Sequence, residues 1–162
     1  MNRMLVAACA AVLLPLSAQA QERAPADHSQ DAAWHNAQQL ALASRQASDG
    51  WGWLDGGVLW RRVAGDGTGK RPTVADNVTL HYAGTFTDGT EFDSSYKRGE
   101  PATFPLGGLI RAWQLAVPMM GVGDTIEIAV PASMGYGPVG RGPIPGGATL
   151  LFKIELLAIP SQ

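Results

Sequence analysis

The fold is decided by residues 78–93, VTLHYAGTFTDGTEFD, where apolar and polar side chains alternate on both sides of a turn. Val78, Leu80 and Tyr82 stand at every second position, which is the period of a strand with one buried face. The Asp-Gly pair that follows is typical of a hairpin, and it returns the chain through Phe92. The stretch therefore predicts two antiparallel strands whose Tyr82 and Phe92 face the same interior.

The same period of two recurs before and after this hairpin. It predicts strands over 58–64, 126–130 and 150–156, and the prolines at both ends of 101–105 indicate a further extended segment. Helical spacing replaces it over 109–117. There, one apolar face two turns long is formed by Leu109, Ala112, Trp113 and Ala116. The periodic part of the chain is therefore expected to be α+β, with one short helix against an antiparallel sheet.

Length and composition agree with one main core. The chain has 162 residues and is 46% hydrophobic, too apolar for a disordered protein. Its 12 Lys and Arg against 14 Asp and Glu give a net charge of −2, without the basic block that a nucleic-acid partner requires. The 20 glycines and 11 prolines argue against a helix bundle and favour short strands joined by turns.

Residues 1–20 have the pattern of a secretory signal peptide. Arg3 gives the positive start, an apolar stretch follows, and Ala18-Gln19-Ala20 is a small-x-small cleavage site. We expect cleavage after Ala20 and export to the periplasm. A buried N-terminal helix is the alternative, and lipid anchoring through Cys9 is a weaker one because the apolar region before it is short for such a signal.

No residue pattern indicates a cofactor or a metal. Cys9 is the only cysteine and would leave with the signal peptide, so neither a disulfide nor a cysteine nucleophile is expected. His28, His35 and His81 lack the spacing of zinc ligands. The glycine run at 65–69 lacks the spacing of a phosphate-binding loop and is expected to be a turn.

Residues 21–50 are expected to form a partly helical N-terminal arm. The stretch from Asp31 to about Ser48 is helix-prone, with Asp27 or Asp31 as N-cap and Gly50 as the stop. Its weak apolar stripe consists of Trp34, Ala37, Leu40 and Ala41. This stripe could dock on the main domain or on a second copy of the chain, or the arm could be frayed and without a function.

Two further segments stand out. The tryptophans at 51, 53 and 60 either mark a contact surface or cover one edge of the sheet, and we prefer the edge. Residues 131–147 form a 17-residue segment with four prolines and six glycines. A loop of that length inside a compact domain is usually functional.

Seven short motifs occur in order over the periodic part, and together they resemble the FKBP-type peptidyl-prolyl cis/trans isomerases. They are Tyr82-Ala83-Gly84, Asp88-Gly89-Thr90, Phe92-Asp93-Ser94-Ser95, Phe104-Pro105-Leu106-Gly107, Ile110-Arg111-Ala112-Trp113, Gly135-Tyr136-Gly137 and the run from Ile144 to Phe152. The resemblance covers roughly residues 57 to 158. It implies an isomerase domain over 51–162, with an antiparallel sheet of five to six strands wrapped around the short helix.

The resemblance also implies an apolar cleft between helix and sheet, with Trp113 as its floor. Its positions assign catalytic roles to Tyr82, Asp93, Ile110 and Tyr136, and contacts with the bound peptide to Phe92, Phe104, Leu109, Trp113, Ile144 and Phe152. Asp93 would be the single acidic group, hydrogen-bonded to Tyr82. From the residues alone, Asp93 could instead cap the turn at Ser94-Ser95.

The implied activity is rotation about X-Pro bonds of exported proteins without a cofactor or metal. The implied partners are Pro-containing polypeptides and folding intermediates, and macrolide inhibitors could share the cleft. Ala102 and Arg141 depart from residues common in the family, which makes substrate preference and macrolide affinity open. A binding module without catalysis and a chaperone dimer joined through the arm are the alternatives, and we expect a monomer.

Overall fold

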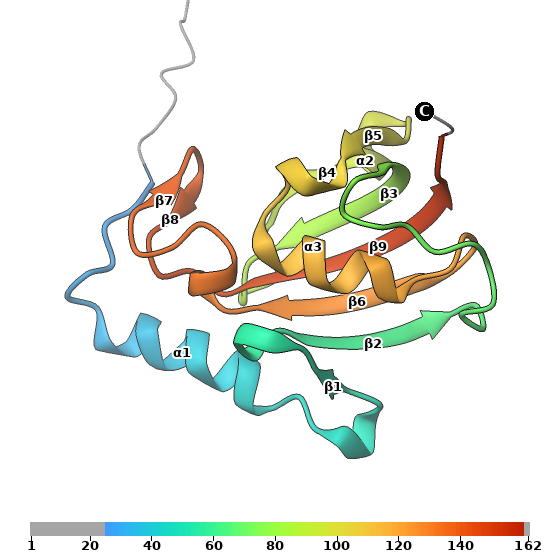
Figure 1. Cartoon of the computed structure of the whole chain (residues 1–162). Helices are drawn as coiled ribbons and strands as arrows, with labels where there is room; N and C mark the ends of the chain where they lie inside the picture. Colours follow the sequence, from blue (N-terminus) through green and yellow to red (C-terminus); the bar gives the residue numbers. More distant parts are fainter. Residues whose placement is uncertain (1–24, 161–162) are drawn as a thin grey trace, which may run out of the picture.

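The structure, a computed structural model, describes residues 25–160 as one antiparallel sheet, a two-stranded ribbon and three helices (Figure 1). The strands are β1 (Gly52–Trp53), β2 (Leu59–Ala64), β3 (Asn77–Thr85), β4 (Glu91–Ser94), β5 (Ala102–Pro105), β6 (Thr125–Val130), β7 (Gly140–Arg141), β8 (Ile144–Pro145) and β9 (Leu150–Ala158). The helices are α1 (Ala32–Ala43), α2 (Ser95–Arg98) and α3 (Arg111–Ala116). The predicted signal peptide and its cleavage site lie outside the described residues.

The large sheet has seven strands in the order β1-β2-β6-β9-β3-β4, and β5 also pairs with β3. Every pairing is antiparallel, and β7 pairs with β8 in a separate ribbon. The expectation of an antiparallel sheet around one short helix is confirmed. The strand number exceeds the expected five to six because residues 52–53, too short to show a period, add β1 to the edge of β2.

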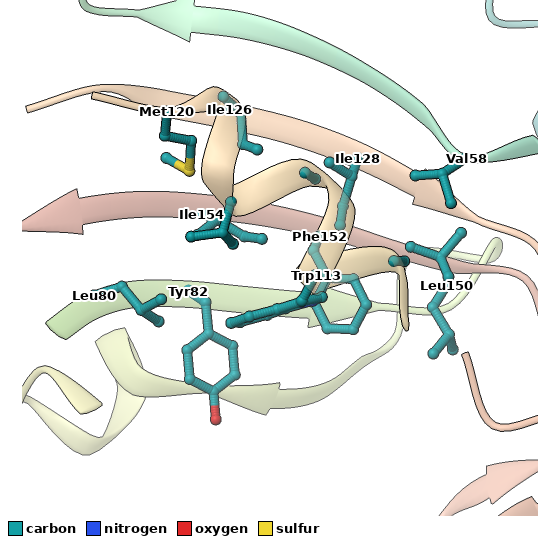
Figure 2. Close-up of a cluster of buried hydrophobic side chains, with 14 of the residues drawn as sticks. Val58, Leu80, Tyr82, Trp113, Met120, Ile126, Ile128, Leu150, Phe152 and Ile154 are labelled. Carbon is teal, nitrogen blue, oxygen red and sulfur yellow. The ribbon is translucent and has the colours of Figure 1, made fainter. Parts of the chain in front are cut away.

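The core lies between the inner face of the sheet and α3 (Figure 2). The alternating residues of β3, β6 and β9 supply one side of it, and α3 supplies Ala112, Trp113 and Ala116. The larger buried side chains are Val58, Val78, Leu80, Tyr82, Met120, Ile126, Ile128, Leu150, Phe152, Ile154 and Leu156. Each fully buried Leu or Ile contributes about 1.5–3 kcal/mol relative to exposure, which makes this face the main source of stability.

Helix α3 is shorter than the predicted helix over 109–117. It begins after Ile110, which has an extended backbone, and 3-10 turns precede and follow it. Leu109 stays outside the helix because its amide closes the turn on the Leu106 carbonyl. The side-chain amide of Gln114 donates to the carbonyls of Gly107 and Leu109, which holds this turn against the helix start.

The N-terminal arm contains α1 but differs from expectation in length and in its buried face. Asp31, one of the two predicted N-caps, caps the helix. The helix ends at Ala43 rather than near 48, and Gly50 closes a separate 3-10 turn. Of the predicted apolar stripe, Trp34 packs against the core as expected, whereas Leu40 is 66% exposed and Ala37 is also exposed. Gln38 is the residue that α1 buries, because its amide meets hydrogen-bond partners on the main domain.

A second, smaller cluster covers the outer face of the sheet near β2. Trp51, Leu59 and Ala129 are its buried members, and Leu42 of α1 packs against them. The guanidinium carbons of Arg45 and Arg61 lie 5.1 and 4.9 Å from the centre of the Trp51 ring. Trp51 therefore covers the sheet as expected, while Trp53 is 66% exposed.

Candidate active site

Nine of the ten residues assigned to the site by resemblance line one cavity of about 240 Å³ between α3 and the sheet. They are Tyr82, Phe92, Asp93, Phe104, Leu109, Ile110, Trp113, Tyr136 and Phe152. The tenth, Ile144, lines a neighbouring cavity of about 380 Å³ that shares Phe92, Asp93 and Tyr136 with the first. Tertiary structure thus gathers residues from β3, β4, β5, α3, the 131–147 segment and β9 into one cleft.

Trp113 forms the closed end of this cleft. It is 4% exposed, and its ring meets Tyr82 and Phe152 edge-on, with centroid distances of 5.4 and 5.3 Å. Figure 2 shows the indole between these two side chains, on the helix that crosses the sheet. The indole Nε1 is buried and has no hydrogen-bond partner among the described residues. Contacts on both sides therefore fix the plane of the indole without using its N–H group.

Phe92 forms a wall at the β4 side. Its ring lies 5.6 Å from Phe152 at 90° and 4.9 Å from Phe86. Gly84 on β3 makes this packing possible, since a Cβ there would lie 2.6 Å from Cζ of Phe92 and 2.8 Å from Cε1 of Phe152. Any side chain at position 84 would therefore displace the two rings that shape the wall.

A three-residue polar network lies at the cleft beside Phe92. The Tyr82 hydroxyl donates to Asp93 Oδ2 at 2.6 Å, which confirms the expected pair. Arg98 of α2 forms an ion pair with Asp93 Oδ1 and also donates to the Tyr82 hydroxyl at 2.9 Å. The cap of α2 is the Ser94 hydroxyl, which accepts the Lys97 N–H, while the Asp93 carboxylate is paired with Tyr82 and Arg98.

The Asp93 carboxylate is ionised, and the positive charge of Arg98 compensates its negative charge. Burial by itself raises the pKa of Asp93, but the hydrogen bonds from Tyr82 and Arg98 outweigh it, so that its pKa is lowered. Burial, together with the hydrogen bond to Asp93, raises the pKa of Tyr82. At neutral pH, Asp93 is therefore ionised and paired, and Tyr82 keeps the proton that it donates.

Two hydrogen-bonding groups around the cleft are left unused by the protein. The Ile110 carbonyl accepts from the amides of Trp113 and Gln114, whereas the Ile110 N–H has no acceptor among residues 25–160. The hydroxyl of Tyr136, on the opposite segment, likewise has no partner in the described part of the chain. The Ile110 N–H and the Tyr136 hydroxyl are therefore available as hydrogen-bond donors to an amide that enters the cleft.

Arg98 and Gly84 are the residues of this site that sequence reasoning missed as contributors. Helix α2 has four residues, too few for an apolar period to reveal it. Its local signal was Ser94 before it and Gly99 after it, which are an N-cap and a left-handed C-cap in the structure. Within residues 25–160, no group of three or more His, Cys, Asp or Glu side chains is arranged as metal ligands, and no helix has the length and apolarity to cross a bilayer.

The family described as FKBP-type peptidyl-prolyl cis-trans isomerase matches residues 69–157, more than half of the chain. The chain belongs to this family. Its match begins after α1 and β2 and includes all ten residues named above for the cleft and its neighbour.

Two bacterial proteins are similar to this chain in sequence. The isomerase named FkpA from Aeromonas hydrophila is 52% identical over 93 residues, which is 57% of this chain and 35% of that protein. The outer membrane protein MIP of Legionella longbeachae is 46% identical over 103 residues, 62% of this chain and 44% of its own. This FKBP-type chain therefore matches less than half the length of either relative.

A crystal structure of a peptidyl-prolyl cis-trans isomerase from Pseudomonas syringae pv. tomato is similar over most of both chains. The TM-score is 0.72 at 30% identity, with 84% of this chain and 98% of that chain covered. FkpA from Escherichia coli gives a TM-score of 0.70 at 33% identity, with 76% of this chain and 57% of that chain covered. The FKBP-type fold of the chain is thus supported by sequence and by structure.

Proposed function

We propose that the chain is a peptidyl-prolyl cis-trans isomerase that accelerates rotation about X-Pro bonds in exported proteins. The observation that carries this proposal is the convergence of Tyr82, Phe92, Asp93, Phe104, Leu109, Ile110, Trp113, Tyr136 and Phe152 on one apolar cavity. Family membership supports it as well. The proposed role of each residue follows from what the rotation requires.

Rotation about an X-Pro bond needs no nucleophile. The barrier of about 18–20 kcal/mol is the amide resonance that is lost when the bond twists. A catalyst must bind the twisted amide better than either planar isomer, because only that difference lowers the barrier. The twisted amide has less charge separation than the planar one, so a dry apolar cleft favours it.

The proline ring is proposed to lie on the Trp113 indole, between the walls made by Phe92, Phe104 and Phe152. The ring plane of Trp113 is fixed by its edge-on neighbours, which gives the proline a flat surface. The carbonyls of the bound peptide would accept from the Ile110 N–H and the Tyr136 hydroxyl. Leu109 and Ile144 would exclude water at the two ends.

Asp93 is proposed to tune the field near the twisting carbonyl without transferring a proton. Arg98 and Tyr82 hold its carboxylate, and its lowered pKa keeps it ionised at neutral pH, where it has no proton to donate and is a weak base. With the charge balanced by Arg98, the cleft keeps a low polarity. The network would therefore act through the position of the Asp93 carboxylate and its electric field at the twisting carbonyl.

Export is part of the proposal. The pattern of residues 1–20 supports a signal peptide cleaved after Ala20 and a periplasmic location, and the similarity to a protein named as an outer membrane protein agrees with export. The proposed partners are Pro-containing polypeptides and folding intermediates of that compartment. Apolar macrolides are proposed to compete for the same cleft. Residues 21–50 are proposed as an arm of the isomerase domain at 51–162.

The proposed activity is tested with a Pro-containing tetrapeptide and an assay that uses no peptidase. The expected result is a rate of cis-to-trans conversion that increases with protein concentration. Peptide binding without any rate enhancement would show a non-catalytic binding module instead. Replacing the residue before proline in a peptide series would then identify the preferred substrate.

A further inference from the structure

Helix α1 lies outside the part of the chain that matches the family, yet it buries a polar side chain against the isomerase fold. Gln38 is 4% exposed, and it is the one buried residue of α1. A buried amide is unfavourable unless its groups are hydrogen-bonded. The hydrogen-bond partners of Gln38 therefore show which elements of the isomerase fold α1 contacts.

The carbonyl of the Gln38 side chain binds Thr149, which lies two residues after the 131–147 segment and directly before β9. Its Oε1 accepts the backbone N–H of Thr149 at 2.9 Å, and the Gln38 backbone carbonyl accepts the Thr149 hydroxyl at 3.3 Å. Thr149 is 1% exposed, so this N–H has no access to water as a substitute acceptor. Removing the Gln38 amide would leave a buried donor without a partner.

The same side chain binds the β3–β4 hairpin. Gln38 Nε2 donates to Thr87 Oγ1 at 3.2 Å and to the Trp34 carbonyl at 3.3 Å. Thr87 follows Phe86, whose ring packs on Phe92 in the wall of the cleft. One side-chain amide thus connects the hairpin to the chain that follows the long segment.

Trp34 strengthens the contact with the long segment. A Cβ at Gly147 would lie 3.5 Å from Cζ3 of Trp34, which places the indole directly against that glycine. The Gly147 N–H donates to the Gly137 carbonyl at 2.9 Å, next to Tyr136. Figure 1 shows α1 beside the β7–β8 ribbon, which this segment contains.

We infer that Gln38 is a positioning residue, which acts by holding the two opposite walls of the cleft, Phe92 on one side and Tyr136 with Ile144 on the other, at a fixed separation. This inference rests on the proposed function. Helix α1 then contributes to the activity of the isomerase domain, and its buried face contacts this domain of the same chain. On the proposed function, these walls would contact the peptide in its planar and in its twisted form, so that their misplacement would weaken the binding of both.

The test compares Gln38→Met with Gln39→Met in the otherwise unchanged chain. The first substitution keeps a long unbranched side chain and removes both hydrogen-bonding groups. The second makes the same change at the next, exposed residue of α1. We expect Gln38→Met to raise KM about five- to tenfold with a smaller change in kcat, because it weakens contacts that the ground state and the transition state share. Gln39→Met should match the unmodified protein.

Amide hydrogen exchange gives a readout that does not depend on activity. In Gln38→Met, exchange at Thr149 and Gly147 should accelerate at least tenfold, while exchange at Ile154 in the centre of β9 stays unchanged. Thr87→Val removes only the hairpin contact and should raise KM less than Gln38→Met does.

Three results would overturn the inference. One is unchanged exchange at Thr149 and Gly147 in Gln38→Met. Another is acceleration at Ile154 equal to that at Thr149, with KM unchanged in the folded protein, since this would make Gln38 a general stabilising residue. The third is an equal rise of KM in Gln39→Met. If the unmodified chain shows no isomerase activity, the proposed function fails, and peptide affinity together with exchange still decides the role of Gln38.

Discussion

Replacing Trp113 with leucine is the most direct perturbation of the cleft, because it removes the flat indole and keeps an apolar side chain. The indole makes two edge-on contacts, at 5.4 Å with Tyr82 and 5.3 Å with Phe152. Each such pair contributes about 0.5–1.5 kcal/mol, and the smaller leucine also leaves a cavity. Loss of the unpartnered buried N–H of Trp113 offsets part of this. We expect the free energy of unfolding to fall by about 2 kcal/mol.

The expected effect of Trp113→Leu on activity follows from the contact area of the proline ring. If the ring buries about 50 Å² of apolar surface on the indole, the contact contributes about 1.3 kcal/mol, using about 25 cal/mol per Å². That free energy corresponds to about a tenfold change in kcat/KM. Leucine retains part of the contact, so we expect kcat/KM to fall about three- to tenfold.

Urea unfolding measures the stability of Trp113→Leu, and a peptidase-free tetrapeptide assay at a temperature where it is fully folded measures kcat/KM. Trp60→Leu is the matched control. Trp60, on β2, packs against the same core and does not line the cleft. It should lose stability and keep its kcat/KM. Full activity in folded Trp113→Leu, or equal losses of activity in both variants, would refute the proposed floor of the cleft.

Three further predictions concern the polar groups and the arm. Asp93→Ala and Tyr136→Phe should each lower kcat/KM about tenfold while the circular dichroism spectrum stays unchanged, and an unchanged kcat/KM in both would remove these residues from the mechanism. Burial raises the pKa of Asp124, but hydrogen bonds from the Gly121 and Gly67 amides and the charge of Arg62 outweigh it, so its pKa is lowered in the folded protein. The stability from Asp124 is therefore present above its unfolded pKa of about 3.9 and is lost as the pH falls through its lower folded value. The melting temperature of the unmodified protein should therefore decrease once the pH is below about 4. The melting temperature of Asp124→Asn should depend less on pH, and an equal pH dependence in both proteins would contradict this assignment. Leu40→Glu, on the exposed face of α1, should leave the mass from light scattering at that of a monomer, and a dimer that this substitution splits would show assembly through the arm.

The sheet could be predicted because its strands depend on local patterns. Val78, Leu80 and Tyr82 alternate with polar residues, and this alternation assigns them to the inner face before any partner strand is known. The apolar face of α3 is equally local, although its first turn is shorter than predicted because the Leu109 amide closes a 3-10 turn. The order of motifs then assigned the cleft residues by resemblance.

The polar contacts could not be predicted in the same way. Arg98 lies five residues after Asp93, and only the left-handed bend at Gly99 and the cap at Ser94 form the short helix that returns its guanidinium to the carboxylate. Gln38 reads as a solvent-exposed residue of a weakly amphipathic helix, because its partners Thr87 and Thr149 are 49 and 111 residues away.

By itself, the amino-acid sequence determined that an antiparallel sheet covers one short helix, and which aromatic side chains face the interior. Both are consequences of hydrophobic burial, which acts on each residue according to its own side chain and its position in a period. The tertiary structure decided that Asp93 pairs with Arg98, that Gly84 allows Phe92 and Phe152 to meet, and that Gln38 is hydrogen-bonded to both Thr87 and Thr149. Hydrogen bonds and close ring contacts are directional and short-ranged, so their partners exist only once distant elements have been brought together.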